Sequence, residues 1–181
     1  MPDWIEPFRK HTMSDTYIIS QLERNNQVFL ELLAGIPDEL IRWRSQPEKW
    51  NLLEIVCHLH DEEREDFRAR IMHVFEKPEE PFVSIDPQGW VKARDYASKN
   101  FYETLNDFVL ERKKSVEWLL SLKNPKWSNA YMHPKVGPVP GSLLLANWLA
   151  HDYLHFRQII KLKYDYLAHV SGEKMDYAGT W

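Results

Sequence analysis

The chain has 181 residues, 44% of them hydrophobic and 28% charged, so it can bury a sizeable core, and we expect one globular domain over 1–181. Its formal net charge of -4 creates no positive field that would gather phosphate backbones, which argues against nucleic-acid binding. The one cysteine, Cys57, excludes an internal disulfide and indicates a reducing compartment. No stretch approaches the ~20 apolar residues of a membrane span, and the charged residues of 1–10 interrupt any signal-peptide core. We therefore expect a soluble, cytoplasmic protein without a membrane partner.

Helical periodicity dominates the first half of the chain, and β-branched residues never run in the alternation that predicts a strand. A first helix is expected to begin at Ser14 or Asp15, either of which can cap exposed amide groups, and to end before Gly35. After a connector of about a dozen residues, Asn51 followed by Glu54 resembles a capping box. A second helix is therefore expected over about 52–75.

Two long connections separate the second, third and fourth expected helices. Three prolines within 78–87 predict a long crossover, followed by a third helix over about 90–122. A loop rich in Pro and Gly then leads to a fourth helix, which Ser142 can cap and which ends near residue 168. Residues 171–181 are expected to form a loose tail, with docking through Tyr177 and Trp181 as the alternative. Four long amphipathic helices with long crossover connections favour an all-α fold, a four-helix bundle.

Two histidines of the fourth helix, His151 and His155, lie one helical turn apart, with Cβ atoms about 5 to 6 Å from each other. Both fall within the apolar stripe of this helix, so we expect them to point into the core. That spacing suits a pair of metal ligands, but hydrogen-bonded core histidines have the same pattern, and the pair alone leaves both interpretations open. His58 on the second helix is a candidate third ligand, although a helical projection puts it about 120° from the apolar centre of that helix.

The segments that contain these histidines, 49–59 and 151–159, resemble the DinB superfamily, also described by its YfiT-like members. The resemblance covers nearly the whole chain, and its most specific part is one histidine early in the second helix plus the His-x-x-x-His of the fourth. It implies a four-helix bundle with an up-down-down-up course and frequent homodimers. It also implies a divalent metal held by His58, His151 and His155.

Three imidazole ligands would leave a zinc ion one open position for water or substrate, which is typical of catalytic sites. Nickel, iron or manganese fit the same ligands, because imidazole discriminates poorly among these metals. The resemblance implies a metal-dependent transferase that uses a low-molecular-weight thiol such as mycothiol or bacillithiol, or a related hydrolase, acting on a small-molecule substrate. The alternative is a non-catalytic, stress-linked bundle that serves as a binding or interaction protein. A zincin protease is excluded, because the segment His-Asp-x-x-His lacks the glutamate base.

The sequence does not assign the catalytic residues, and Glu62 and Arg112 are the candidates. Glu62 and Glu54 each lie one turn from His58, so either could orient an imidazole or accept a proton. We favour the alternative, in which residues 61–66 form a solvated charged face. Arg112 lies on the buried line of the third helix, and we expect its stem to pack while its head reaches water; an anion clamp in a cleft is the sharper alternative.

Three further polar residues are weaker candidates for a role at the site. Asp152 is expected to face a neighbouring helix or solvent rather than a metal. His133, in the loop before the fourth helix, could approach the mouth of the bundle. Cys57 lies near the apolar arc of the second helix, so we expect it to pack in the core rather than take part in redox chemistry.

Overall fold

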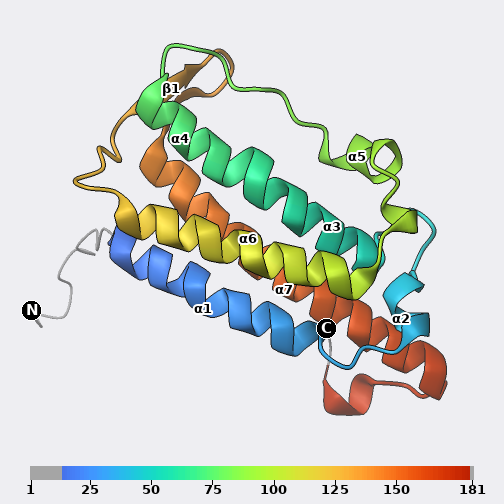
Figure 1. Cartoon of the computed structure of the whole chain (residues 1–181). Helices are drawn as coiled ribbons and strands as arrows, with labels where there is room; N and C mark the ends of the chain where they lie inside the picture. Colours follow the sequence, from blue (N-terminus) through green and yellow to red (C-terminus); the bar gives the residue numbers. More distant parts are fainter. Residues whose placement is uncertain (1–13, 180–181) are drawn as a thin grey trace, which may run out of the picture.

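Long helices that lie side by side form a bundle in the computed structural model, which describes residues 14–179 (Figure 1). Their bounds are α1 (Asp15–Leu33), α3 (Leu52–Glu62), α4 (Arg68–Glu76), α6 (Phe101–Ser121) and α7 (Gly141–Ser171). A π-helical turn, η1 (Glu63–Phe67), joins α3 to α4, so these two helices act as one element of the bundle. The predicted all-α four-helix bundle is therefore confirmed.

The course of the chain through the bundle follows from the direction of each helix. In Figure 1, α1 and α7 run one way, while the α3–α4 element and α6 run the opposite way. This is the up-down-down-up course, and it requires a long crossover because the α3–α4 element and α6 are parallel neighbours. Within the bundle α1 packs against α6 and α7, and the α3–α4 element packs against the same two helices.

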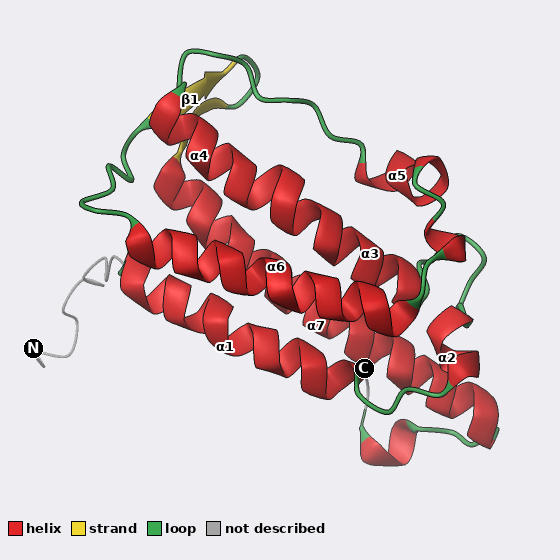
Figure 2. Ribbon diagram, viewed as in Figure 1, coloured by secondary structure: helices red, strands yellow, loops and turns green. Residues whose placement is uncertain are grey.

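The connections between the long helices contain short elements, which are visible outside the bundle in Figure 2. Helix α2 (Asp38–Arg42) lies in the first connector, and α5 (Pro87–Ala93) with the 3-10 turn η2 (Tyr96–Ser98) lies in the crossover. Strands β1 (Ala130–His133) and β2 (Gly137–Pro140) form an antiparallel hairpin before α7, and a 3-10 turn, η3 (Asp176–Ala178), follows it. Because α2, α5 and η2 all pack against α3, that helix is covered on its outer side as well as its inner side.

The beginnings of the first two helices agree with the capping signals. The Ser14 side chain accepts a hydrogen bond from the Tyr17 amide at 3.2 Å, so α1 begins where predicted. At α3, the Glu54 amide donates to Asn51 Oδ1 at 2.9 Å and the Asn51 amide donates to Glu54 Oε2 at 3.0 Å, which completes the expected capping box. The second helix therefore starts at Leu52 as predicted.

The predictions for the other two helices need correction. The third helix was expected from residue 90, but α6 begins at Phe101, because Asp95 adopts a left-handed backbone (φ 47°) and Asn100 caps the new helix. Ser142 is not the cap of α7, which begins one residue earlier at Gly141. A side chain at this glycine would put its Cβ 3.1 Å from the Phe75 ring, so any larger residue here would have to displace that ring slightly.

Two remaining expectations concern the ends of the chain and membranes. Most of 172–179 is exposed, as expected for a loose tail, while 180–181 lie outside the described residues. Among residues 14–179, no helix has the length and apolar character needed to cross a membrane.

Candidate metal centre

Three histidines from two helices converge on one point between α3 and α7. Nε2 of His151 lies 3.3 Å from Nε2 of His58 and 3.0 Å from Nε2 of His155. One potential ligand atom from each of the three histidines lies within 4.8 Å of the other two. The fold thus brings the candidate ligand from the second helix to the pair on the fourth.

His58 points into this cluster although its position on a helical projection is marginal. A projection assumes that one side of a helix is buried and the other is wet. Every residue of 51–59 is buried instead, because α2, α5 and η2 cover the outer side of α3. The ring of Trp50 lies 4.7 Å from the ring of His58 and covers it on one side.

The distances from Nε2 of His151 to the other two histidines fit a single metal ion. A tetrahedral ion with metal–nitrogen bonds of ~2.0 to 2.1 Å holds its ligand nitrogens about 3.3 Å apart. The observed separations of 3.0 and 3.3 Å match this value. Hydrogen bonds alone do not account for the cluster, because His151 Nε2 faces two imidazole nitrogens and a carboxylate oxygen but has only one hydrogen or lone pair to offer. A cation at the centre satisfies all of these groups.

The protonation of the histidines also fits metal binding. Burial lowers the pKa of His58 to about 3 and that of His155 to about 3, with the neighbouring His151 acting in the same direction on both. Glu62 opposes the change at His58, and the Gln158 side chain opposes it at His155. At neutral pH both rings are therefore uncharged and have a nitrogen lone pair for a metal, so protons do not compete for the site.

The carboxylate of Glu62 lies beside the three histidines. Its Oε2 lies 3.1 Å from Nε2 of His151, and its Oε1 lies 3.8 Å from Nδ1 of His58. Burial raises its pKa, but the hydrogen bond with His151 and the charges around it outweigh burial and keep the pKa below its ordinary value. Glu62 is therefore ionised at neutral pH, beside the nitrogens of the histidine cluster.

The interpretation of 61–66 as a solvated charged face is wrong for its first three members. Asp61, Glu62 and Glu63 are all buried. The hydroxyl of Tyr96 donates to Asp61 at 2.7 Å, and Arg94 forms an ion pair with the same carboxylate at 2.8 Å. These acids are therefore paired inside the protein rather than hydrated.

Arg112 occupies the centre of a second buried network. It donates from Nη1 and Nη2 to the two oxygens of Asp152, both at 2.8 Å, and from Nε to Glu63 at 2.9 Å. Its side chain is 1% exposed, so the expectation that its head reaches water is wrong. Burial opposes its charge, but Asp152 and Glu63 outweigh burial and raise its pKa. The anions that Arg112 holds are carboxylates of the protein itself. Asp152 faces a neighbouring helix, which was one of the two environments predicted for it.

The other candidates lie apart from the three histidines. Glu54 is engaged by the capping box and by Arg44, which donates to it at 2.5 Å. His133 lies on β1, where its Nδ1 accepts from the Lys135 amide at 3.2 Å. Cys57 is buried, as predicted, and burial raises its pKa to about 12, which leaves its thiol protonated and unreactive.

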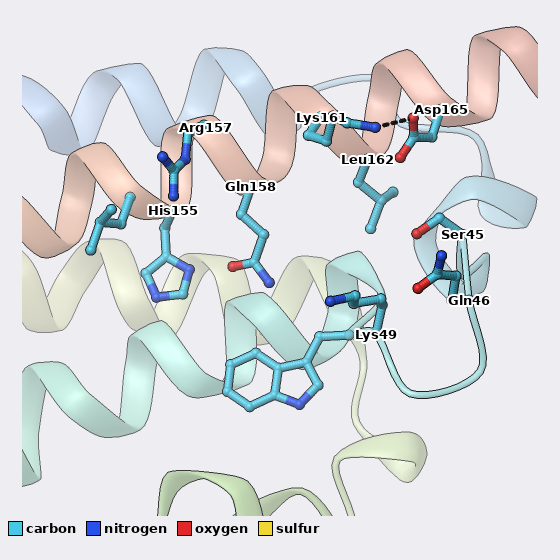
Figure 3. A pocket seen from close by; sticks show the side chains of 11 residues that line it. Ser45, Gln46, Lys49, His155, Arg157, Gln158, Lys161, Leu162 and Asp165 are labelled. Carbon is cyan, nitrogen blue, oxygen red and sulfur yellow. Dashed lines mark hydrogen bonds and ion pairs between the residues drawn. The ribbon is translucent and has the colours of Figure 1, made fainter. Parts of the chain in front are cut away.

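Two grooves reach the histidine cluster, and apart from His151 and His155 the residues that line them were not predicted as members of the site. One groove, of about 650 Å³, lies between α7 and the loop before α3, and it contains His155 and Trp50 (Figure 3). The other, of about 370 Å³, contains His151 and Phe67. Trp50 stands directly before the cap of α3, and this position next to a predicted helix start is the one local signal that could have identified it.

Comparisons with known proteins agree with this architecture. The solved structure of YfiT from Bacillus subtilis, described as a probable metal-dependent hydrolase with an unusual four-helix bundle topology, matches with a TM-score of 0.75. The match covers 92% of this chain and 94% of that one at 15% sequence identity, so it shows a shared fold. No curated protein matches the chain. The family model of the DinB superfamily matches residues 21–159, and this chain belongs to that superfamily.

Proposed function

We propose that this protein is a metal-dependent hydrolase of a small molecule, in which His58, His151 and His155 hold a divalent cation. The observation that supports this proposal is the convergence of three imidazoles with one ionised carboxylate, that of Glu62, whose Oε2 lies 3.1 Å from Nε2 of His151. A zinc ion, or nickel, iron or manganese in its place, keeps its full positive charge among such ligands and lowers the pKa of a water or thiol that it binds.

Glu62 acts as the proton acceptor in this proposal. When water attacks the substrate, its oxygen forms the new bond and one of its protons passes to Glu62, which then gives it to the leaving group. A carboxylate whose pKa is held below its ordinary value is in the basic form at neutral pH. Because its Oε2 lies 3.1 Å from Nε2 of His151, Glu62 is within reach of a water that lies beside the histidine cluster.

The accessibility of the cluster favours a catalytic metal site over a structural one that only connects two helices. A structural metal site is closed by protein on all sides, whereas a catalytic one keeps a position open. His155 contributes to the wall of one groove and His151 to the wall of another, so a small molecule can approach the cluster along α7. This accessibility supports catalysis rather than the non-catalytic alternative.

The test of this proposal replaces Glu62 by glutamine. Glu62→Gln keeps the size of the side chain but removes its capacity to accept a proton, so kcat for ester or amide hydrolysis should fall by about a hundredfold or more. The metal content by elemental analysis should stay at one ion per chain. Glu65→Gln is the matched control, because Glu65 belongs to the same acidic run but forms its hydrogen bonds with Arg94 and Arg64.

Two results would contradict the proposal in different ways. If Glu62→Gln loses the metal, Glu62 is a ligand rather than a base. If the unaltered protein holds no stoichiometric metal, the whole site has been misinterpreted.

A thiol-dependent transferase is the second candidate, and the groove beside His155 favours it. Lys49 and Arg157 line this groove, and their charges suit the carboxylates of a cysteine-derived thiol such as bacillithiol. In this reaction Glu62 receives the thiol proton and the thiol sulfur forms the bond to the electrophile. The bond from the electrophile to its leaving group breaks, and the leaving group departs with the electron pair and takes up the proton from Glu62. Consumption of an electrophile that requires added thiol would favour the transferase, whereas consumption in water alone would favour the hydrolase.

A further inference from the structure

The two grooves that reach the histidine cluster share one residue, Leu154, and meet the cluster from opposite sides. We name them the cationic groove (Lys49, Trp50, His155, Arg157, Lys161 and Asp165 among its walls) and the apolar groove (Phe67, Leu143, Leu144, Ala150 and His151 among its walls). Leu154 lines both grooves and is 53% exposed, so it does not close one groove off from the other. Together the grooves form a path along α7 with the histidines at its middle.

The cationic groove has an excess of positive charge. Lys49, Arg157 and Lys161 line it against a single carboxylate, Asp165. Lys161 forms an ion pair with Asp165, so Lys49 and Arg157 account for the excess. The chain as a whole has a net charge of -4, so this local excess is not a general property of its surface. Figure 3 shows Lys49 on the wall across from His155 and Gln158, which project from α7.

The apolar groove differs in charge and composition. Its two charged residues, Asp66 and Arg70, form an ion pair with each other, so they add no net charge. The remaining walls are dominated by aliphatic and aromatic side chains, with Asn147 as the other polar residue besides His151. Such a surface binds an apolar group through the hydrophobic effect and repels an unpaired charge.

We propose that the protein binds a small molecule with a negatively charged group at one end and an apolar group at the other. The charged group, a carboxylate or a phosphate, lies against Lys49 and Arg157, and the apolar group lies in the groove beside Phe67 and Leu143. The middle of the molecule then lies over the three histidines. This assignment of the substrate class rests on the proposed function, because it takes the histidine cluster as the reaction centre.

Calorimetric titration of the full-length protein with a graded set of probes tests this assignment. Phenylbutyrate has both ends, phenylbutanamide replaces the charge by a neutral amide, and butyrate lacks the ring. We expect phenylbutyrate to bind about tenfold or more tightly than either of the others. Phenylpropyl phosphate, in a parallel arm, shows whether the cationic groove prefers phosphate over carboxylate.

Charge reversal in the groove provides the decisive comparison. Lys49→Glu and Arg157→Glu should each weaken phenylbutyrate binding about fivefold to tenfold and leave phenylbutanamide unchanged. Both side chains are exposed, so neither variant disturbs the core. Arg24→Glu, which changes the same charge on an exposed residue of α1, is the matched control and should bind like the unaltered protein. Leu143→Gln should weaken binding of phenylbutyrate but not of butyrate.

Three results would overturn the assignment. They are equal binding of charged and neutral probes, binding that Lys49→Glu and Arg157→Glu leave unchanged, and no measurable binding of any probe. The titrations are repeated on metal-free protein. If phenylbutyrate no longer binds there, its carboxylate only coordinates the ion, and the proposed role of the groove is contradicted. Hydrolysis is measured separately, so binding by the groove without turnover contradicts the proposed function alone.

Discussion

Replacing Arg112 by methionine is expected to destabilise the bundle by about 4 kcal/mol, because removal of one partner from a buried ion pair costs about 3 to 5 kcal/mol. The side chains of Arg112 and Glu63 are each 1% exposed and that of Asp152 is 0% exposed, so water cannot replace the guanidinium. Each carboxylate keeps one other donor, since Asn25 donates to Asp152 at 2.9 Å and Trp148 donates to Glu63 at 3.0 Å. The cost should therefore stay near that of one broken pair rather than double.

Urea denaturation followed by circular dichroism measures this loss as a lower free energy of unfolding. Arg157→Met removes an exposed arginine and should change the free energy by less than about 0.5 kcal/mol. A triple variant that also replaces Asp152 and Glu63 by apolar residues should recover most of the loss, because it leaves no unpaired buried charge. A change below about 1 kcal/mol for Arg112→Met would refute the reasoning, since a pair that is worth so little is not shielded from water.

Two further predictions concern the histidines. His155→Ala should weaken zinc binding by more than about a hundredfold in a chelator competition, since even the loss of a group that only orients a ligand costs ~10- to 100-fold. The control variant His133→Ala should bind zinc normally in the same measurement. Unchanged zinc affinity in His155→Ala would remove His155 from the ligand set. Metal-free protein should be most stable above pH 6.5 and lose stability as pH falls toward 3, because His58 and His155 have a lower pKa in the folded chain than their ordinary 6.5. At pH 5 each should cost about 2 kcal/mol, from about 1.4 kcal/mol for each of the one and a half pH units below 6.5; denaturation midpoints that stay flat between pH 7.5 and 5 would contradict this.

The helix starts at Ser14 and at Asn51 were predictable because a cap is a local device that joins residues three apart. The same device marks α6, where Asn100 precedes Glu103 by three residues, and it was overlooked in favour of an earlier start. The spacing of His151 and His155 was predictable for the same reason, since both lie on one helix. The homodimer and the cytoplasmic location stay predictions, because contacts within one chain do not determine them.

Tertiary contacts explain why the acidic run was misinterpreted. A run of acids usually indicates a solvated face. Asp61 and Glu62 do have local partners, Arg64 and His58, but each of the three acids also has a partner from a segment far along the chain. Tyr96 binds the first, His151 the second and Arg112 the third. No local pattern connects these residues, so their pairing could not be inferred from the sequence around the run.

Three consecutive acids at the junction of α3 and η1 constrain how the α3–α4 element is rotated. Successive side chains of a helix point about 100° apart, so these acids face the crossover, the histidine cluster and the bundle interior in turn. Asp61 and Glu63 are each held by buried hydrogen bonds, on either side of Glu62. The direction of the Glu62 carboxylate is therefore set by its two neighbours.

Arg112 also constrains the position of the candidate ligands on α7. It binds Glu63, the neighbour of Glu62, and Asp152, the neighbour of His151, although it touches neither site residue in the contacts of residues 14–179. Arg112→Met should then weaken zinc affinity as well as stability, whereas Leu119→Ala, a core truncation that costs about 2 to 5 kcal/mol, should weaken stability alone. Chelator competition at a temperature where both variants are folded separates the two effects. An equal loss of zinc affinity in both would mean that Arg112 contributes only to general stability and does not orient the metal site.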